Sequence, residues 1–288
     1  MTVTPNAPSP SQVPSAEAGE PILEIEHVGR HFDTPNGRVT AVEDISMTVQ
    51  RGEFVSIIGP SGCGKSTLFS MIGGLLSTST GSIHIAGEAI NGPHPSIGMV
   101  FQEDSTFPWR TVVENVAFPL ELQGVPKAER LEKARHFIDL VGLSGFEKSY
   151  PSELSGGMRQ RVSIARTLVF EPKLLLMDEP FAALDEQTRL LLGDKVSQIQ
   201  AELNQTILLI THNIAEAVQL SDRVMIMSYR PGRNKRMLPI ELPRPRTSEM
   251  LSSDAFGHYV AQIWGDLREE AGRGMQESEQ ASRGRRHG

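Results

Sequence analysis

The stretch Gly59-Pro60-Ser61-Gly62-Cys63-Gly64-Lys65-Ser66 fits the pattern G-x-x-x-x-G-K-[ST] and lies between two segments of different character. Phe54–Ile58, before it, is a short apolar run typical of a buried strand, and Lys65–Leu75, after it, is interpreted as a helix. Glycines let the backbone curl so that several N–H groups point at phosphate oxygens, and the helix adds the positive end of its dipole. The stretch therefore predicts a strand–loop–helix unit that binds phosphates.

Two side chains of this loop have chemical roles of their own. Lys65 is suited to place a positive charge on β- and γ-phosphates, and the Ser66 hydroxyl can ligate Mg²⁺. A dinucleotide fingerprint is disfavoured, because Gly62-x-Gly64 is followed by Thr67 where a third glycine is needed. Cys63 lies near a helix N-terminus, which lowers a thiol pKa, so it is either reactive or a small filler of the loop; we favour the filler.

A second apolar run, Lys173-Leu174-Leu175-Leu176-Met177-Asp178-Glu179-Pro180, ends in two carboxylates. Asp178 at the strand end is placed to hold Mg²⁺, directly or through water, since this ion prefers oxygen ligands and keeps several waters. Glu179, one residue further and turned differently, is suited to polarise the water that attacks a γ-phosphate. Alone, such a pair is more often a solvated strand end; together with the phosphate loop it predicts a hydrolytic site.

A third motif, Leu154-Ser155-Gly156-Gly157-Met158-Arg159-Gln160-Arg161, opens a helix with a serine and two glycines. It is a second helix start suited to bind an anion. One nucleotide does not need two such sites on a single subunit. Two chains arranged head to tail would use both, each placing its Ser155–Gly157 on the γ-phosphate held by the other, so the sequence predicts a dimer.

Composition excludes several other classes of protein. The chain has 288 residues, with 28 Lys and Arg against 35 Asp and Glu and a net charge of −7, which disfavours an electrostatic nucleic-acid binder. The single cysteine excludes an internal disulfide and fits a reducing compartment. We find neither an apolar stretch long enough to span a membrane nor a signal peptide, and expect a soluble cytoplasmic protein.

Apolar strands that alternate with helical stretches predict a mainly parallel sheet with helices on both faces. Antiparallel pairing is expected only in the first fifty residues, where Asn36-Gly37 predicts a hairpin turn. Residues 1–20 are rich in Pro, Ser and Ala and predict a disordered leader, and residues 270–288 predict a disordered tail. Between them Phe256, Val260, Ile263 and Leu267 follow a helical period, so we expect an amphipathic helix that docks on the core.

From about Leu23 to Pro245 the sequence resembles the ATP-binding subunit of ABC transporters, with the family's motifs in order and spacing. The resemblance implies an α/β P-loop NTPase: a RecA-like, mainly parallel sheet core with an N-terminal antiparallel β subdomain and an inserted helical subdomain. The implied division is an ATPase domain over 22–245, a helical insert over 103–158 that carries the Ser-Gly-Gly motif, and a helical extension over 246–269.

The resemblance also assigns residues that their own chemistry leaves open. Phe32, otherwise a core aromatic, sits where an aromatic ring stacks on adenine, and Gln102 matches the glutamine that links Mg²⁺ and the attacking water to the membrane partner. Asp185 belongs to a segment that crosses the dimer interface, and His212 matches a histidine that contacts the γ-phosphate. Met158 stands where the family usually has Gln. The implied nucleotide-binding set is Phe32, Gly59, Pro60, Ser61, Gly62, Cys63, Gly64, Lys65, Ser66, Thr67, Ser155, Gly156, Gly157 and Asp185; the catalytic set is Lys65, Gln102, Glu179 and His212; the Mg²⁺ set is Ser66, Gln102 and Asp178.

Within the family, several segments resemble importers of the nitrate, sulfonate and taurine type: 106–112, 179–185, 228–233 and 242–246. Residues 103–118 would form the groove for a short helix of the membrane subunit, with Phe107, Pro108 and Trp109 as apolar contacts; alternatively, Trp109 is simply buried. The basic stretch 230–246 would either touch anionic lipids or, as we favour, stay solvated.

The resemblance implies ATP and Mg²⁺ as cofactors. Its implied partners are a second copy of the chain, two integral membrane permease subunits and, indirectly, a solute-binding protein, with no nucleic acid. The chain would be peripheral, on the cytoplasmic face of the membrane. A stand-alone ABC ATPase acting on nucleic acid or ribosomes is the alternative, although the cassette fusions and long insertions usual in that class do not occur here. A small-molecule kinase would leave Ser155–Gly157 unexplained.

Overall fold

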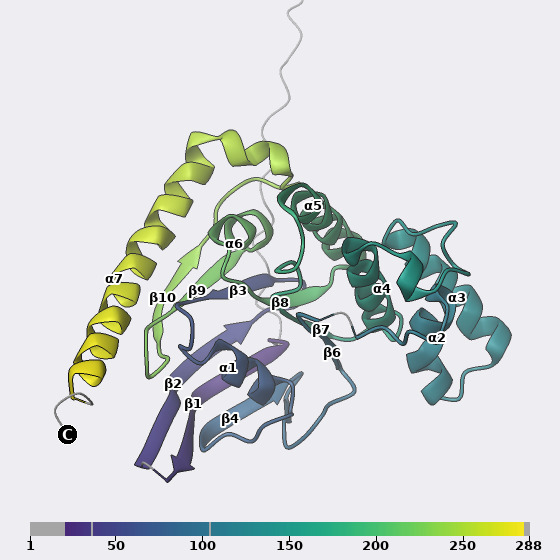
Figure 1. Ribbon diagram of the computed structural model, residues 1–288. Helices are drawn as coiled ribbons and strands as arrows, with labels where there is room; N and C mark the ends of the chain where they lie inside the picture. Colours follow the sequence, from purple (N-terminus) through teal and green to yellow (C-terminus); the bar gives the residue numbers. More distant parts are fainter. Residues whose placement is uncertain (1–20, 36, 104, 285–288) are drawn as a thin grey trace, which may run out of the picture.

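The computed structural model describes residues 21–35, 37–103 and 105–284, with side chains as far as 274. Two sheets face each other across helix α1 (Lys65–Ile72), which packs between them (Figure 1). The first sheet is antiparallel, with strand order β2-β1-β4-β5. Its strands are β1 (Leu23–Thr34), β2 (Gly37–Val49), β4 (Thr80–Ile85) and β5 (Glu88–Ala89). β1 and β2 form the predicted hairpin, with Thr34 opposite Gly37 at its tip.

The second sheet has the order β10-β9-β3-β8-β7-β6. Its neighbours are parallel except for the β9–β10 pair. β3, β7 and β8 are mostly apolar and almost entirely buried. This confirms the prediction of a mainly parallel core sheet that is covered on both faces. The strands are β3 (Phe54–Ile58), β6 (Ile97–Val100), β7 (Leu174–Asp178), β8 (Thr206–Ile210), β9 (Arg223–Met227) and β10 (Asn234–Pro239).

Antiparallel pairing extends further than the first fifty residues, contrary to our expectation. β4 pairs with both β1 and β5, and β10 pairs with β9 at the edge of the core sheet. Short loops explain two of these pairs, because β4–β5 and β9–β10 are joined by segments too short for the crossover that parallel neighbours require.

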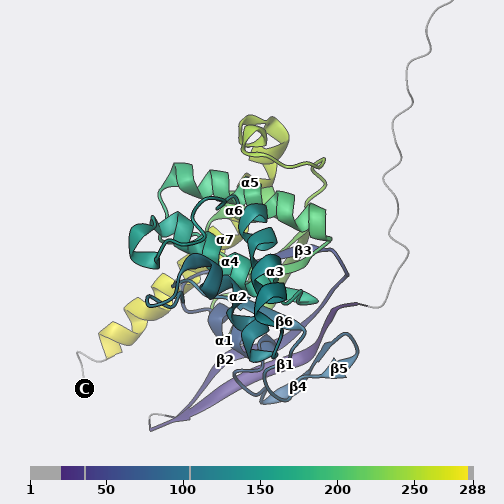
Figure 2. The same cartoon turned by 90° about the vertical axis from the view of Figure 1, so that its right-hand side faces the viewer.

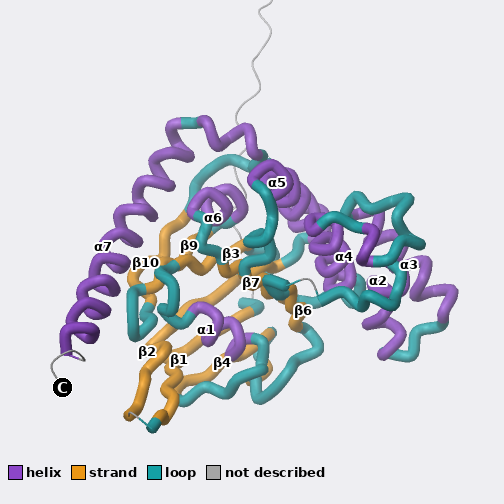
Figure 3. Tube along the Cα trace, viewed as in Figure 1, coloured by secondary structure: helices purple, strands orange, loops and turns teal. Residues whose placement is uncertain are grey.

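Helices cover both faces of the parallel sheet (Figure 3). α2, α3 and α4 pack on one another and project from one end of it, as Figures 1 and 2 show from two sides. α5 and α6 cover the face opposite α1, and α7 runs along β9 and β10 at the other end of the molecule. The bounds are α2 (Val112–Leu122), α3 (Lys127–Leu140), α4 (Gly156–Leu168), α5 (Glu186–Leu203), α6 (Ile214–Leu220) and α7 (Asp254–Gly284), with short 3₁₀ turns at Pro151–Glu153 and Ser248–Ser252.

The C-terminal region differs from the sequence-based expectation. Phe256 and Ile263 of α7 are buried, as the periodicity predicts. However, the helix begins later than residue 246 and continues past residue 270 to Gly284, where a disordered tail was expected. The expected start of the tail is wrong because Glu270, a polar residue in a low-hydrophobicity segment, is buried by contacts with distant residues. The predicted leader, 1–20, lies outside the described residues. No described helix is both long enough and apolar enough to cross a bilayer.

Candidate active site

The phosphate loop joins β3 to α1, as the sequence predicts. Gly64 precedes the helix at φ +102°, and a Cβ there would lie 2.6 Å from the Ala41 carbonyl oxygen of β2, so this position requires glycine. The Lys65 ammonium donates hydrogen bonds to the carbonyls of Gly59 (2.8 Å) and Pro60 (3.1 Å) and is only 8% exposed. The carbonyl groups of the loop therefore hold the Lys65 ammonium inside it.

The loop lines a cavity of about 450 Å³. Val39–Ala41 of β2 form one wall, and Glu179 and Arg230 also reach it. Phe32 is the register partner of Val39 across the β1–β2 hairpin and is 37% exposed, with the Arg30 guanidinium 4.8 Å from its ring centre. Gln102 is exposed and does not line this cavity. The loop residues that line the cavity are Ser61, Gly62, Gly64, Lys65, Ser66 and Thr67.

Cys63 is buried inside the loop. Burial raises the pKa of its thiol, and the nearby Lys65 charge opposes this only in part. A buried thiol that stays protonated is a poor nucleophile. These features favour the loop-filler interpretation over a reactive cysteine.

Asp178 is the last residue of β7, and Glu179 follows it with a different backbone conformation. Glu179 is left-handed, at φ +45°, and its N–H donates to the Ile210 carbonyl at 2.8 Å. This unusual conformation for a non-glycine residue turns Glu179 toward the phosphate-loop cavity. His212, two residues after the end of β8, places its Nδ1 3.1 Å from the Glu179 carboxylate. The two predicted catalytic residues are thus in contact, although they are 33 positions apart in the chain.

The environment of Asp178 makes its charge unfavourable. Burial and then the charge of Glu179 raise the Asp178 pKa, while Lys65 lowers it. A raised acid pKa means that the folded state binds the proton more tightly than the unfolded state. The free energy of unfolding therefore falls as pH rises from the ordinary pKa of aspartate through the raised value.

From this we expect Asp178→Asn to raise the thermal midpoint of the nucleotide-free protein at pH 7, because the variant keeps the shape and removes the unfavourable charge. The difference in thermal midpoint between the variant and the wild-type protein should disappear as the pH is lowered toward the ordinary pKa of an aspartate. Thermal unfolding of both proteins from pH 4 to pH 8 tests this. A variant that is destabilised equally at every pH would show that the Asp178 charge is not the cause.

Glu216 is a buried carboxylate that the sequence analysis did not identify, and it hydrogen-bonds to Thr211, the residue before His212. Thr211 donates its hydroxyl proton to Glu216 at 2.5 Å, and Arg189 Nε lies 3.4 Å from the other oxygen of Glu216. Burial raises the pKa of Glu216, against the opposing hydrogen bond from Thr211. The signal in the sequence is Asn213 followed three residues later by Glu216, a helix-start pattern, and Asn213 does cap α6.

The Ser-Gly-Gly motif forms the start of α4, and the start of α5 packs against it. The Ser155 hydroxyl caps α4 by accepting the Met158 N–H at 3.3 Å. Asp185 caps α5 by accepting the N–H of Thr188 at 2.9 Å, and hydrogen bonds from Thr188 lower the Asp185 pKa. A Cβ at Gly157 would lie 2.6 Å from the Thr188 methyl carbon, so the contact between the two helix starts requires glycine.

Within one chain this motif and the phosphate loop are not brought together. Ser155, Gly157 and Met158 line a different cavity, of about 400 Å³, which shares no residue with the phosphate-loop cavity. The structure therefore groups the predicted nucleotide-binding residues into two separate sets.

The aromatic residues of the segment predicted to receive the membrane partner pack on one another. The Phe107 ring packs edge-on against the Phe118 ring, with 4.7 Å between the ring centres. It packs tilted against the Trp109 ring, with 5.6 Å between the centres. Asn115, fully buried, accepts the Phe107 N–H at 2.7 Å and donates to the carbonyls of Phe107, Arg110 and Thr111. Trp109 is 72% exposed, so the alternative that it is simply buried is wrong.

The donor set at the loop suits Mg²⁺ better than a transition metal. In the described part of the chain, no three or more His, Cys, Asp or Glu side chains are grouped to hold a metal. Ser66 supplies a hydroxyl and Asp178 a carboxylate, which leaves the other positions to water and phosphate oxygens. Mg²⁺ is commonly bound in this way.

Comparisons with known proteins agree with this geometry. A sequence model of the family described as ABC transporter matches residues 42–182. The nitrate import ATP-binding protein of a Synechocystis species is 45% identical over 89% of this chain and 98% of its own length. An aliphatic sulfonates import ATP-binding protein of Bacillus cereus is 44% identical over 78% of this chain and 88% of its own.

Solved structures show the same fold. A cassette of an ABC transporter complex from Clostridium perfringens superposes with a TM-score of 0.70 at 30% identity, over 77% of this chain and 90% of that one. A dimeric ATP-binding cassette bound to ADP and Pi gives a TM-score of 0.67 at 29% identity, over 77% of this chain and the whole of that one. The chain belongs to the ATP-binding, ATP-hydrolysing subunits of ABC transporters, with a P-loop NTPase fold.

Proposed function

We propose that this chain drives an importer: two copies pair head to tail, bind two ATP molecules between them and couple hydrolysis to uptake through two permease subunits. The observation that carries the proposal is the separation of the phosphate loop from Ser155–Gly157 into two cavities of one chain. A head-to-tail partner completes each site by supplying the missing half. The dimeric cassette bound to ADP and Pi supports the pairing of two copies.

Each half of such a site has defined roles. Glu179 is the general base for the attacking water, and His212 in contact with it orients the carboxylate and reaches the γ-phosphate. Lys65 and the loop N–H groups hold the β- and γ-phosphates, Phe32 stacks on adenine, and Asp185 lies at the dimer interface. Ser155, Gly156 and Gly157 of the opposite copy complete the γ-phosphate site.

Mg²⁺ would be held by Ser66 and Asp178, with Gln102 joining it on the side of the membrane partner. When bound, it neutralises charge on the transferring phosphoryl group. The Asp178 carboxylate, whose charge is unfavourable in the protein alone, gains a compensating cation there.

The named relatives support the class of solute. The relatives named for nitrate and aliphatic sulfonates import match most of this chain, so we propose an oxyanion or sulfonate importer, with the solute received from a solute-binding protein. The chain would then act on the cytoplasmic face of the membrane. Detergent extraction followed by purification of the tagged chain tests this: two integral membrane subunits should co-purify, and a purely soluble complex with nucleic acid or ribosomes would refute it.

The exposed tryptophan offers a sharper test of membrane coupling. Trp109→Ala should weaken permease binding about 30-fold or more, because an aromatic anchor at an interface contributes about 2 kcal/mol or more. ATP binding by the isolated chain should not change. Trp264, which is 59% exposed on α7, is the matched control, and Trp264→Ala should leave the complex intact. Equal loss of permease from both variants, measured by co-purification, would argue against Trp109 as the contact.

A further inference from the structure

The basic stretch 230–246 is largely solvated, as we favoured: Arg230, Arg233, Arg236 and Arg244 are exposed, and Arg246 is buried. Most of its positive charges are nevertheless compensated within the chain. The described arginines from 223 to 246 have carboxylate partners in the chain with one exception. The pairs are Arg223–Glu53 (3.2 Å), Arg233–Glu43 (2.8 Å), Arg236–Asp266 (3.2 Å), Arg244–Asp222 (2.7 Å) and Arg246–Asp222 (3.9 Å). Among the described residues no carboxylate pairs with Arg230.

Arg230 instead reaches the phosphate loop. Its Nε donates a hydrogen bond to the Gly62 carbonyl at 2.8 Å, and its side chain lines the cavity that holds Lys65 and Ser66. A Cβ at Gly62 would lie 2.6 Å from the guanidinium, so glycine also admits this close approach. An uncompensated guanidinium at the wall of a phosphate-binding cavity is suited to bind phosphate oxygens.

The segment that carries Arg230, residues 228–233, is fixed from the side of the loop. The Gly232 N–H donates to the Ala41 carbonyl at 3.0 Å, and the Glu43 N–H donates to the Gly232 carbonyl at 2.9 Å. A Cβ at Gly232 would collide with the Cys63 carbonyl oxygen. The segment therefore packs directly on both β2 and the phosphate loop.

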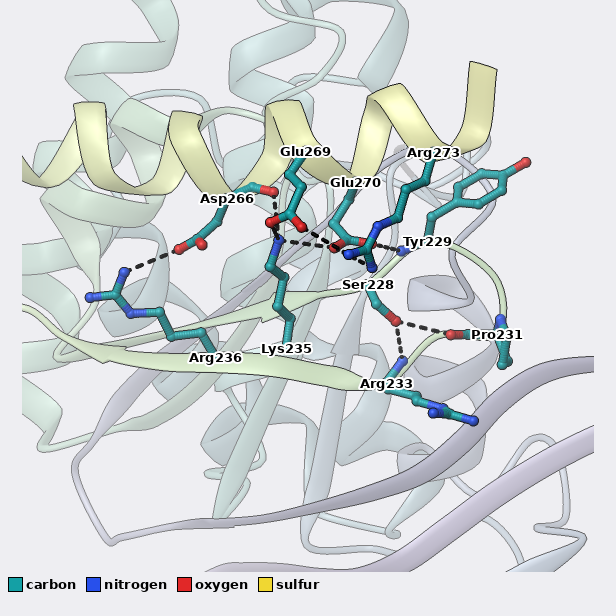
Figure 4. Close-up of polar contacts among 10 residues, drawn as sticks. All are labelled: Ser228, Tyr229, Pro231, Arg233, Lys235, Arg236, Asp266, Glu269, Glu270 and Arg273. Atoms are coloured by element: carbon teal, nitrogen blue, oxygen red, sulfur yellow. Dashed lines mark hydrogen bonds and ion pairs between the residues drawn. The ribbon is translucent and has the colours of Figure 1, made fainter. Parts of the chain in front are cut away.

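The same segment is fixed on its other side by α7 (Figure 4). Glu270, 1% exposed, accepts the N–H of Tyr229 at 2.9 Å, one residue before Arg230. Its other oxygen lies 2.9 Å from the ammonium of Lys235, two residues beyond the segment. The Tyr229 ring lies on Gly274, where a Cβ would be 2.7 Å from a ring carbon. One buried carboxylate thus ties the chain on both sides of Arg230, at Tyr229 and at Lys235, to the C-terminal helix.

We propose that Arg230 is a further phosphate-binding residue of the nucleotide site and that α7 holds it there through Glu270. The C-terminal helix then sets the affinity of the site for nucleotide, and Glu270 is a positioning residue. The inference rests on nucleotide binding at the phosphate loop and is independent of import and of the permease partners.

The first test measures ADP affinity, with Mg²⁺, of the full chain by titration calorimetry, since ADP avoids hydrolysis. Arg230→Gln should raise the Kd about five- to tenfold, the range for one exposed charge-assisted contact, and should flatten the dependence of the Kd on salt. Arg233→Gln is the matched control: its arginine lies in the same segment but pairs with Glu43, and the Kd should change less than about twofold. Equal effects of both variants, or no effect of Arg230→Gln in a chain that binds ADP, overturns the proposal. A wild-type chain that binds no ADP would instead refute the assigned nucleotide site.

The second test asks whether α7 acts through Arg230. Glu270→Ala should raise the Kd about three- to fivefold, and Glu269→Ala, at an exposed neighbour that also contacts Lys235, should change it less than about twofold. In the Arg230→Gln background, Glu270→Ala should not raise the Kd further, because its effect is exerted through the guanidinium that this background lacks. If the effects of the two substitutions on the Kd add, Glu270 has only a structural role and does not act through Arg230.

A third variant keeps the test valid if Glu270→Ala does not fold. Gly274→Ala removes no charge and improves helix propensity, but its methyl group displaces the Tyr229 ring. It should weaken ADP binding in the wild-type background and not in the Arg230→Gln background. Unchanged affinity in both backgrounds overturns the role of α7.

Discussion

Glu179→Gln is expected to lower ATP turnover by about 10²–10⁴-fold, the range for loss of a general base. The amide keeps the size of the side chain and an oxygen next to His212, but it cannot accept the proton of the attacking water. ATP binding should persist because Lys65 and the loop N–H groups are unchanged. In the proposed dimer, hydrolysis would release the closed pair, so the variant should accumulate as an ATP-bound dimer.

Phosphate release under steady state measures the turnover, and size-exclusion chromatography with ATP measures the dimer. Glu186→Gln is the matched control, because Glu186 is an exposed residue in the first turn of α5 that pairs with Arg189. It should retain nearly full turnover. Near-normal hydrolysis by Glu179→Gln would show that Glu179 is not the general base.

Mixing two inactive variants is expected to restore ATP hydrolysis. Lys65→Ala damages the loop half of a site, and Ser155→Arg places a bulky cation at the opposite half, so each homodimer has only damaged sites. A heterodimer pairs the intact loop of one chain with the intact Ser155 of the other. With random pairing, about a quarter of wild-type activity should return if the two sites act independently, because half of the dimers are mixed and each has one good site.

The control mixes Lys65→Ala with Glu179→Gln, whose changes lie in the same half of the site. No combination of these chains contains an intact site, so activity should not return. Restoration in the control, or none in the first mixture when heterodimers are shown to form, would contradict the shared-site arrangement.

The local parts of the site follow directly from the sequence. The phosphate loop, the carboxylate pair after β7 and the serine cap of α4 each depend on residues within a few positions of one another. Glycine at 64, for example, fits the left-handed backbone at the start of α1, at φ +102°, and the family resemblance names the partners of each motif. The parallel core also follows, because fully apolar strands alternating with helices have few other solutions.

Contacts between segments that are distant in the chain are harder to predict from the sequence. Glu270 looks like part of a solvated tail in the sequence, and Arg230 looks like one of six similar basic residues. Which arginine stays unpaired depends on where Glu43, Asp222 and Asp266 come to lie, and no period or motif records that.

The sequence by itself determined that the chain binds phosphates and how each loop, cap and strand end is built, because those features depend on neighbours along the chain. Tertiary structure alone decided that Ser155 and Lys65 of one chain face different cavities, that His212 meets Glu179, and that Glu270 holds the segment beside the phosphate loop. The physical reason is that pairing and burial of polar groups depend on the packing of the whole domain, where residues far apart in sequence compete for the same few partners.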